Sequence, residues 1–159
     1  MVQHNDGRRV SARAIILRDN KILVFKRKRF DVEEGGFLEY YSIPGGGVEM
    51  DESVEDACVR ELKEEMGIDI TLLKKVAIRY ANRHENHMFV AEIVRGEPYF
   101  VPDSEEARAQ NPFNQFEVQW VPVAELTVEN MLFYSSFLPV IQAYAKGELP
   151  AEPLELKGD

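Results

Sequence analysis

Short apolar runs and alternating apolar and polar positions recur along most of this 159-residue chain. Runs of this kind predict β-strands when turn-forming residues bound them. Asp19 and Asn20 form one such boundary, and a second turn is predicted within residues 82–86. The predicted strands are residues 10–17, 21–26, 40–43, 72–80, 87–94 and 116–121.

Two segments have the patterns of helices. Ser53 can cap the first free N–H groups of one helix, and Gly67 suits the left-handed position just past its end. A second helix is predicted from a cap at Ser136 to Gly147, with Pro139 tolerated in its first turn. Apolar residues form a stripe along the first helix. This stripe consists of Val54, Cys58, Val59, Leu62 and Met66.

Strands interrupted by two substantial helices predict an α/β fold, a sandwich in which helices cover both faces of a mixed β-sheet. The chain has the length of one domain. No repeat, linker or low-complexity segment divides residues 1–159. We therefore predict a single domain, with a loose tail from about residue 150.

The first predicted helix and the loop before it are strongly acidic. Between residues 46 and 68 the chain places eight carboxylates but only two basic residues. Glu61, Glu64 and Glu65 stand at positions i, i+3 and i+4, so one helix face carries all three. Glu61 and Glu65 repel each other by about 0.2–0.5 kcal/mol, and the helix dipole disfavours Glu64 and Glu65 in the last turn. A bound cation would reverse both penalties.

A group of carboxylates such as this one binds hard cations in preference to softer metals. Mg²⁺ binds one or two carboxylates, several waters and substrate phosphates, so the pattern predicts a metal-phosphate site. The alternative is a solvated acidic face in which Glu61 and Glu64 pair with Arg60 and Lys63. The neighbouring apolar stripe favours the metal site, because it places the carboxylates at the edge of the core. Residues 44–47 also form a glycine-rich loop that can approach a ligand closely.

The acidic segment contains a motif with fixed spacing. It reads Gly46-x5-Glu52-x7-Arg60-Glu61-Leu62-x-Glu64-Glu65-x-Gly67-Ile68. This motif resembles the signature of the Nudix hydrolases, MutT-like proteins among them, with every fixed position filled. The similarity extends to residues 41–49, 120–122 and 125–126. One departure is Asp51, where many members carry glycine.

The resemblance implies an α/β/α sandwich that hydrolyses a nucleoside diphosphate linked to another group, with Mg²⁺, or Mn²⁺ in its place, at the signature helix. Arg60 and Glu52 match supporting positions of the family. Arg60 can orient Glu64 one turn later, and Glu52 can anchor the preceding loop. The positions that match the family's metal-binding residues are Gly45, through its carbonyl, Glu61, Glu64 and Glu65.

Further acidic residues follow in the second half of the chain. Glu105 and Glu106 lie in a loop between two predicted strands, and they are candidates for a general base or an additional metal ligand. Their alternative is a solvated polar loop. Glu117 lies on a predicted strand and faces either the cleft or water. His84 and His87 flank a predicted turn, and we interpret both as turn or surface residues.

A basic run at residues 26–29 follows an apolar strand. Arg27 and Arg29 in this run are candidates for binding substrate phosphates from the opposite wall of the cleft. Gly46 and Gly47 of the glycine-rich loop are candidates for the same substrate contact. The alternative is that the basic run is a solvated strand end.

Composition excludes several other classes of protein. The formal net charge of −9 argues against a nucleic-acid partner, because no broad basic surface is available. A single cysteine, Cys58, leaves no disulfide framework and indicates a reducing compartment. The start of the sequence has no signal-peptide pattern, and no apolar run reaches membrane-spanning length. We therefore expect a cytoplasmic protein without a membrane partner.

Two function classes stay open at this point. The first is a metal-dependent pyrophosphohydrolase, and the second is a nucleotide-binding regulator that keeps the fold without turnover. The three helical carboxylates favour the enzyme, because a binding protein would not require them. The expected ligand is a nucleotide diphosphate derivative, with nucleoside triphosphates and nucleotide sugars both open. A homodimer is also open, since the apolar residues 131–133 can serve an interface or the core.

Overall fold

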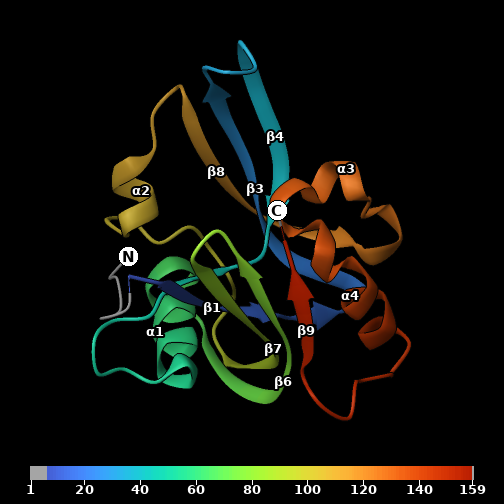
Figure 1. The fold of residues 1–159 in the computed structure, drawn as a ribbon. Coiled ribbons are helices and arrows are strands. Elements are labelled where there is room, and N and C mark those ends of the chain that lie inside the picture. Colours follow the sequence, from blue (N-terminus) through green and yellow to red (C-terminus); the bar gives the residue numbers. More distant parts are fainter. Residues whose placement is uncertain (1–6, 159) are drawn as a thin grey trace.

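The computed structural model describes residues 7–158 and contains two β-sheets with helices packed around them (Figure 1). The first sheet has the strand order β5-β1-β7-β6-β9. It is mixed, because β1 pairs with β7 and β6 pairs with β9 in parallel, whereas the other neighbours are antiparallel. Its strands are β1 (Arg9–Ile15), β5 (Gly45–Gly47), β6 (Asp69–Ala81), β7 (His84–Arg95) and β9 (Leu154–Lys157).

The second sheet is antiparallel and is built around its longest strand, β3. The short strand β2 and the strands β4 and β8 all pair with β3. The predicted turn after β2 is present, with positive φ angles of 52° at Asp19 and 59° at Asn20. The strands of this sheet are β2 (Leu17–Arg18), β3 (Lys21–Asp31), β4 (Gly36–Ser42) and β8 (Asn114–Pro122).

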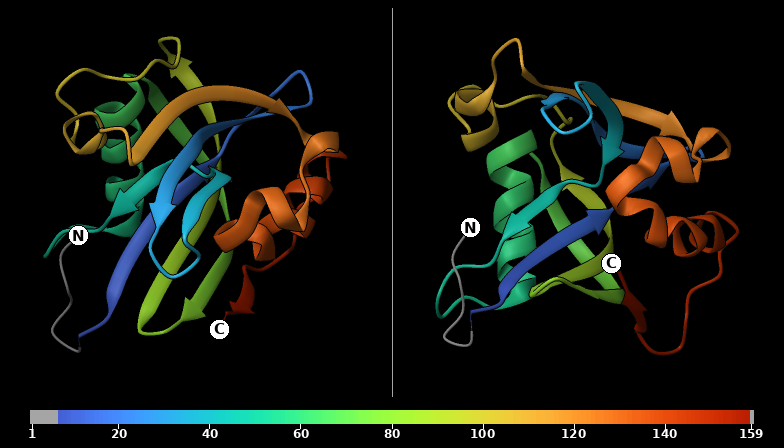
Figure 2. Two further views of the ribbon diagram at one scale, coloured as in Figure 1. Left: turned by 90° about the horizontal axis from the view of Figure 1, so that it is seen from above. Right: turned by 45° about the horizontal axis from the view of Figure 1, so that its top comes forward.

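Helices cover the strands from opposite sides, with α1 on one side and α3 and α4 on the other (Figure 2). One apolar core contains the inward residues of α1, and a second contains those of α4. This arrangement confirms the predicted α/β fold with a mixed sheet. The helices are α1 (Val54–Met66), α2 (Glu105–Ala109), α3 (Val128–Met131) and α4 (Leu138–Ala145), with 3₁₀ turns η1 (Val123–Glu125) and η2 (Leu132–Phe137).

The acidic helix α1 begins and ends as its sequence predicts. The hydroxyl of Ser53 accepts a hydrogen bond of 3.0 Å from the backbone N–H of Asp56. Gly67 follows the helix in the left-handed conformation, with φ 67°. Most of the predicted apolar stripe is buried, but Val59 is exposed and Ala57 is buried in its place. At 100° per residue, Ala57 lies one turn before Glu61 on the buried side of the helix, whereas Val59 falls beyond the opposite edge of that buried face.

The predicted helix near the C-terminus needs one correction. Its cap is not Ser136, because the 3₁₀ turn η2 runs directly into α4 and Phe137 already has helical backbone angles. A helix that continues a preceding turn has N–H groups that are already paired, and it needs no side-chain cap. Pro139 does lie in the first turn, and Gly147 follows the end with φ 79°.

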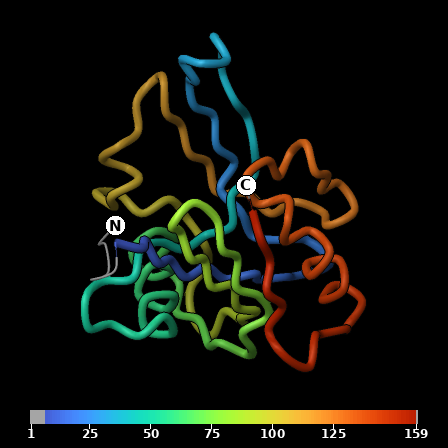
Figure 3. Tube along the Cα trace, in the orientation of Figure 1, coloured from blue at the N-terminus to red at the C-terminus, as the bar shows by residue number. Residues whose placement is uncertain are grey.

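The C-terminal segment departs from the expectation of a loose tail. Leu154–Lys157 forms β9, which pairs in parallel with β6 from Ala77 to Tyr80, and Figure 3 traces this return of the chain to the sheet. The edge of β6 offers unpaired backbone groups, and a four-residue strand can satisfy them without a strong apolar pattern of its own. Tertiary pairing therefore orders a segment in which sequence periodicity is weak.

Candidate metal centre

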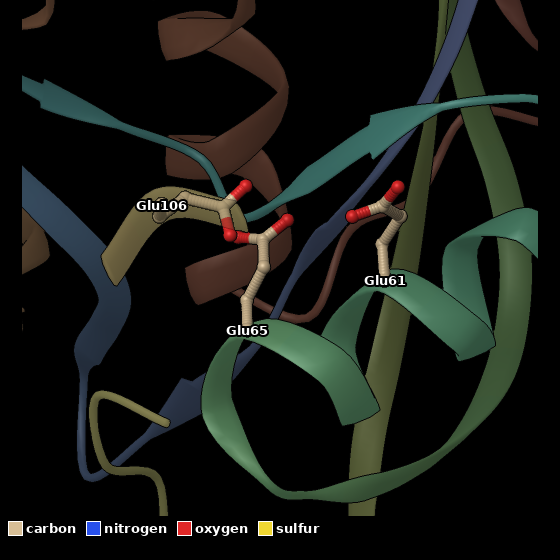
Figure 4. Close-up of side chains that lie close together, drawn as sticks. All are labelled: Glu61, Glu65 and Glu106. Atoms are coloured by element: carbon tan, nitrogen blue, oxygen red, sulfur yellow. The ribbon is translucent and has the colours of Figure 1, made fainter. Parts of the chain in front are cut away.

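Two glutamates of α1 point toward a glutamate of α2 (Figure 4). Glu61 and Glu65 lie one turn apart on the same face of α1, and their exposed fractions are only 8% and 2%. Glu106 approaches them from the short helix α2. One carboxylate oxygen from each residue can be chosen so that all three lie within 4.8 Å of one another. Three carboxylates therefore converge at the edge of the core.

All three carboxylates are weaker acids than usual, chiefly because they are buried. Burial raises the pKa of Glu65 well above its usual value, and the charges of Glu106 and Glu61 raise it further. Burial likewise raises the pKa of Glu61 and of Glu106. Glu65 and Glu106 are therefore hard to ionise beside neighbouring carboxylates without an added positive charge.

Arg60 is the main cation beside this group, and it makes five hydrogen bonds. Its Nε and Nη2 atoms donate to the two oxygens of Glu52 at 2.8 and 2.9 Å. Its Nη1 atom donates to Glu61 at 3.1 Å and to Glu64 at 3.2 Å. Nη2 also donates to the carbonyl of Gly47 at 2.9 Å. One guanidinium thus ties the glycine-rich loop to the acidic face of α1.

The two remaining glutamates of the motif lie outside the converging group. Glu64 has a side chain that is 57% exposed, and its carboxylate is paired with Arg60. Glu52 accepts from Arg60 and also from the backbone N–H of Glu49 at 3.1 Å. The expected anchoring contact of Glu52 and the expected pair between Arg60 and Glu64 are both present in the structure. A direct metal contact for Glu64 stays a prediction.

The glycine-rich loop passes beside the carboxylates as β5. A Cβ atom at Gly46 would lie 2.5 Å from the carboxyl carbon of Glu61, so any other residue there would displace this carboxylate. Gly45 pairs with Arg13 on β1, and a Cβ atom at Gly45 would collide with the carbonyl oxygen of Ala12. Metal binding by the Gly45 carbonyl stays a prediction. Asp51 in this loop has a left-handed backbone with φ 65°. Glycine adopts this conformation more easily, which accounts for the glycine that many family members carry at this position.

The donor set fits a hard divalent cation. Glu65 Oε1 is buried and has no hydrogen-bond partner among the described residues. Neither Glu65 nor Glu106 has an ion-pair partner within residues 7–158. Unpaired buried carboxylate oxygens are costly, and coordination of Mg²⁺ or Mn²⁺ would satisfy them. Glu61, Glu65 and Glu106 are therefore the residues that could hold such an ion.

The remaining acidic candidates lie elsewhere. Glu105 is exposed on α2, next to Glu106 but not among the converging carboxylates. Glu117 is also exposed, and it lines a separate cavity of about 750 Å³ together with Lys26 and Lys28. Side chains alternate along a strand, so Lys26 and Lys28 lie on the opposite face of β3 from Arg27 and Arg29.

The structure separates the two candidate arginines of the basic run. Arg27 lies over the ring of Phe116 at 3.8 Å, and its Nη2 atom donates to Asn114 at 2.7 Å. Arg29 instead lines a cavity of about 630 Å³, and the rings of Tyr40 and Phe133 line the same cavity next to it. A role in substrate binding stays a prediction for both arginines.

The histidines are more buried than their interpretation as turn or surface residues suggests. His84 is partly buried and shares a hydrogen-bond contact of 2.8 Å with the hydroxyl of Ser11. His87 is buried, and its Nε2 atom lies 2.7 Å from a carboxylate oxygen of Glu85. Both follow the short turn at residues 82–83 within β7, whose pairing with β1 buries them. The periodicity of the sequence did not reveal that β1 pairs with β7.

Sequence reasoning missed Arg13, an arginine on β1 that acts on Glu65, the most buried of the three acids. Its charge acts on Glu65, its Nη1 atom donates to the carbonyl of Ile43 at 2.7 Å, and it lines the 630 Å³ cavity. The available signal was a charged residue between Ala12 and Ala14 in an apolar strand. Because side chains alternate along a strand, Arg13 lies on the opposite face of the strand from Ala12 and Ala14.

Comparisons with known proteins agree with this fold and this acidic helix. The model of the NUDIX domain family matches residues 7–140. The chain is 35% identical over 105 residues to an ADP-ribose pyrophosphatase of Methanocaldococcus jannaschii, a match that covers 62% of this chain and 59% of the relative. It is 36% identical over 89 residues to an 8-oxo-dGTP diphosphatase of Escherichia coli, covering 54% of this chain and 67% of that protein.

A solved structure supports the architecture. The crystal structure of a NUDIX hydrolase from Nitrosomonas europaea matches with a TM-score of 0.69 and 17% sequence identity, and the match covers 98% of this chain and 82% of that one. At this identity the likeness concerns the fold. The matched segment spans about three fifths of the archaeal relative. Within the described residues, no helix is long and apolar enough to cross a membrane.

Proposed function

The chain belongs to the NUDIX family, and from this premise we propose that it is a metal-dependent pyrophosphohydrolase. Its substrate would be a nucleoside diphosphate linked to a further group, and its reaction the attack of water on phosphorus. The observation that carries the proposal is the convergence of Glu61, Glu65 and Glu106 within 4.8 Å, two of them buried. A binding protein without catalysis would not require three carboxylates in so costly an arrangement.

The proposed roles follow from the element that carries each side chain. Glu61 and Glu65 would hold the cation from the rigid helix α1, and Glu106 would complete the ligand set from α2. When bound, a divalent cation supplies neutralising charge to phosphate oxygens and lowers the pKa of a coordinated water. Glu64 would act at the rim, where its carboxylate helps to hold Arg60. The Gly45 carbonyl would be a further ligand.

Arg60 would act as a positioning residue. Its contacts with Glu52 and the Gly47 carbonyl fix the guanidinium, and its remaining nitrogen then fixes the carboxylate of Glu61. A carboxylate held in this way loses less conformational freedom when a cation binds. The same contacts hold the glycine-rich loop close to the acidic face, where backbone groups can approach a phosphate.

The relatives define the first substrates to test. One is named an ADP-ribose pyrophosphatase and another an 8-oxo-dGTP diphosphatase. These compounds share a nucleoside diphosphate unit and differ in what is attached to it. We therefore propose this unit as the recognised core, with ADP-ribose, nucleoside triphosphates including 8-oxo-dGTP, and nucleotide sugars as the candidates.

A substrate panel with and without Mg²⁺ tests the proposal. Each compound is incubated with the protein, and the products are identified by mass spectrometry. We expect at least one compound to yield a nucleoside monophosphate only when Mg²⁺ or Mn²⁺ is present. We also expect turnover to be lost in Glu65→Gln and kept in Glu55→Gln, which alters an exposed glutamate on the same helix. Metal-independent binding of nucleotides without turnover of any compound would instead indicate the regulator.

A further inference from the structure

A cavity of about 630 Å³ is lined by five arginines. We refer to it as the arginine cavity, and its volume lies in the range of small-molecule sites. The arginines come from β1, β3, β6 and the turn between β6 and β7, and the aromatic residues come from β4 and η2. The five arginines are Arg9, Arg13, Arg29, Arg79 and Arg83.

The described chain supplies no opposite charge inside the cavity. No aspartate or glutamate is among its lining residues, although the sequence as a whole carries a net charge of −9. Within residues 7–158, Arg9, Arg13, Arg29 and Arg79 make no ion pair. Positive charges held together in this way repel one another, and a bound anion would offset the repulsion.

Several guanidinium groups in the cavity have unused donors. The Nε atoms of Arg13, Arg29 and Arg79 are buried and have no hydrogen-bond partner among the described residues. Buried N–H groups without partners are uncommon in native proteins, and each one calls for a ligand or an ordered water. The pKa of His84, which also lines the cavity, is lowered by burial and then by the charges of Arg13 and Arg79.

Aromatic rings hold two of the arginines in place. The guanidinium of Arg29 lies 5.3 Å from the ring centre of Phe133 and 5.9 Å from that of Tyr40. The guanidinium of Arg13 lies 5.0 Å from the ring centre of Tyr134. A cation–π contact uses none of the N–H donors of a guanidinium, and those donors match the oxygens of a phosphate group.

The arginine cavity adjoins the acidic centre through Arg13. This residue lines the cavity, pairs on β1 with Gly45 of the glycine-rich loop, and acts electrostatically on Glu65. An elongated substrate can therefore place its diphosphate at the acidic centre and a second part in the cavity. A neutral base or sugar would fill that space but would leave the arginine charges unbalanced.

We propose that the arginine cavity binds a phosphate monoester on the substrate, in addition to the diphosphate that is cleaved, and so selects nucleotide derivatives that carry such a group. This inference rests on the proposed function for its link to turnover. The additional phosphate monoester is a feature of the substrate for which the acidic centre alone would not select. Arg29 and Arg79, which come from different sheets, would contact the phosphate from two sides.

Matched substrates that differ by one phosphate provide the test. ADP-ribose is compared with its 2′-phosphate, and dephospho-coenzyme A is compared with coenzyme A, each in the presence of Mg²⁺. We expect kcat/KM to be at least about tenfold higher for the phosphorylated member of one pair, mainly through KM. Arg29→Gln and Arg79→Gln should each reduce that preference. Arg95→Gln, which changes a highly exposed arginine outside the cavity, should leave it unaltered.

Binding in metal-free buffer separates this inference from catalysis. Calorimetry with the 2′-phosphate of ADP-ribose should show tighter binding than with ADP-ribose, and Arg79→Gln should remove the difference. If this difference is found while no compound is hydrolysed, the phosphate site stands and the proposed catalysis fails. If both members of each pair are bound and cleaved equally well, and the arginine substitutions change nothing, the phosphate site is refuted and the catalysis stands.

Discussion

The acidic centre and the arginine cavity are neighbouring regions with opposite charge. In the acidic centre, oxygens of Glu61, Glu65 and Glu106 lie within 4.8 Å of one another. In the cavity, five arginines meet without a carboxylate among the lining residues. Like charges repel one another within each region. Ion pairs between the carboxylates of one region and the arginines of the other would have relieved this repulsion in both. Their separation fits the two ligand sites that we propose, one for a cation and one for an anion.

The two regions also differ in how their charged groups are held. The acidic centre is fixed by hydrogen bonds, because Arg60 ties Glu61 to Glu52 and to the glycine-rich loop. In the arginine cavity, aromatic rings lie next to the guanidinium groups of Arg13 and Arg29. Hydrogen bonds define the direction of a carboxylate, whereas a ring leaves the donor edge of a guanidinium available. The difference suits a cation that needs directed ligands and a phosphate that accepts many donors.

Removing one buried acid should have the largest effect. We expect Glu65→Gln to lower kcat/KM by at least about 100-fold, because it removes a metal-holding oxygen and its charge. The same variant should be as stable as the wild type or more stable without metal, since the repulsion from Glu61 and Glu106 is relieved. Initial rates and urea unfolding measure the two results.

Magnesium sharpens this first prediction. At about 100 times its dissociation constant, Mg²⁺ should stabilise the wild type by about 2.7 kcal/mol, and this gain should be absent in Glu65→Gln. Glu55→Gln, at an exposed position of the same helix, is the matched control and should retain the gain. A Glu65→Gln protein that keeps full activity and full stabilisation by Mg²⁺ would contradict a metal site at this position.

Changing the residue that fixes the acidic centre should have a smaller effect. Arg60→Lys keeps the positive charge, but one ammonium group cannot reproduce the contacts to Glu52, Glu61 and the Gly47 carbonyl together. We expect Mg²⁺ affinity to fall about 10- to 100-fold, as for other partners of metal ligands. Activity measured against Mg²⁺ concentration reports this affinity. Arg95→Lys is the control, and equal affinities in the two variants would show that charge alone matters at position 60.

The smallest effect is expected from pH at the edge of the arginine cavity. Burial, Arg13 and Arg79 lower the pKa of His84 below its usual 6.5, so the folded protein favours the neutral ring. The stability that this provides is present above pH 6.5 and is lost as the pH falls below it, because the unfolded chain takes up the proton first. Urea unfolding between pH 7.5 and 5.5 should show a steeper loss for the wild type than for His84→Gln. Identical slopes would indicate that neither burial nor the arginine charges lower the pKa of His84 in the folded protein.

The acidic helix was largely determined by local sequence. Ser53 and Gly67 define its ends, and the spacing of Glu61 and Glu65 places them on one face whatever surrounds the helix. Glu64 shows the limit of that reasoning, because three residues and four residues along a helix differ by 100° in direction. The core therefore covers Glu65 and leaves Glu64 exposed beside Arg60. Sequence also named Glu105 and Glu106 together, and only the packing of α2 separated them.

Other features depended on contacts between distant segments. The strand β9 exists because the edge of β6 has backbone groups to pair, and α4 needs no cap at Ser136 because η2 leads into it. The arginine cavity is the clearest case, since its residues come from strands far apart in the sequence. Repeats of 3.6 or two residues reveal which face of one element a side chain occupies. They do not reveal which faces meet, because strand register and sheet packing are decided by the whole chain at once.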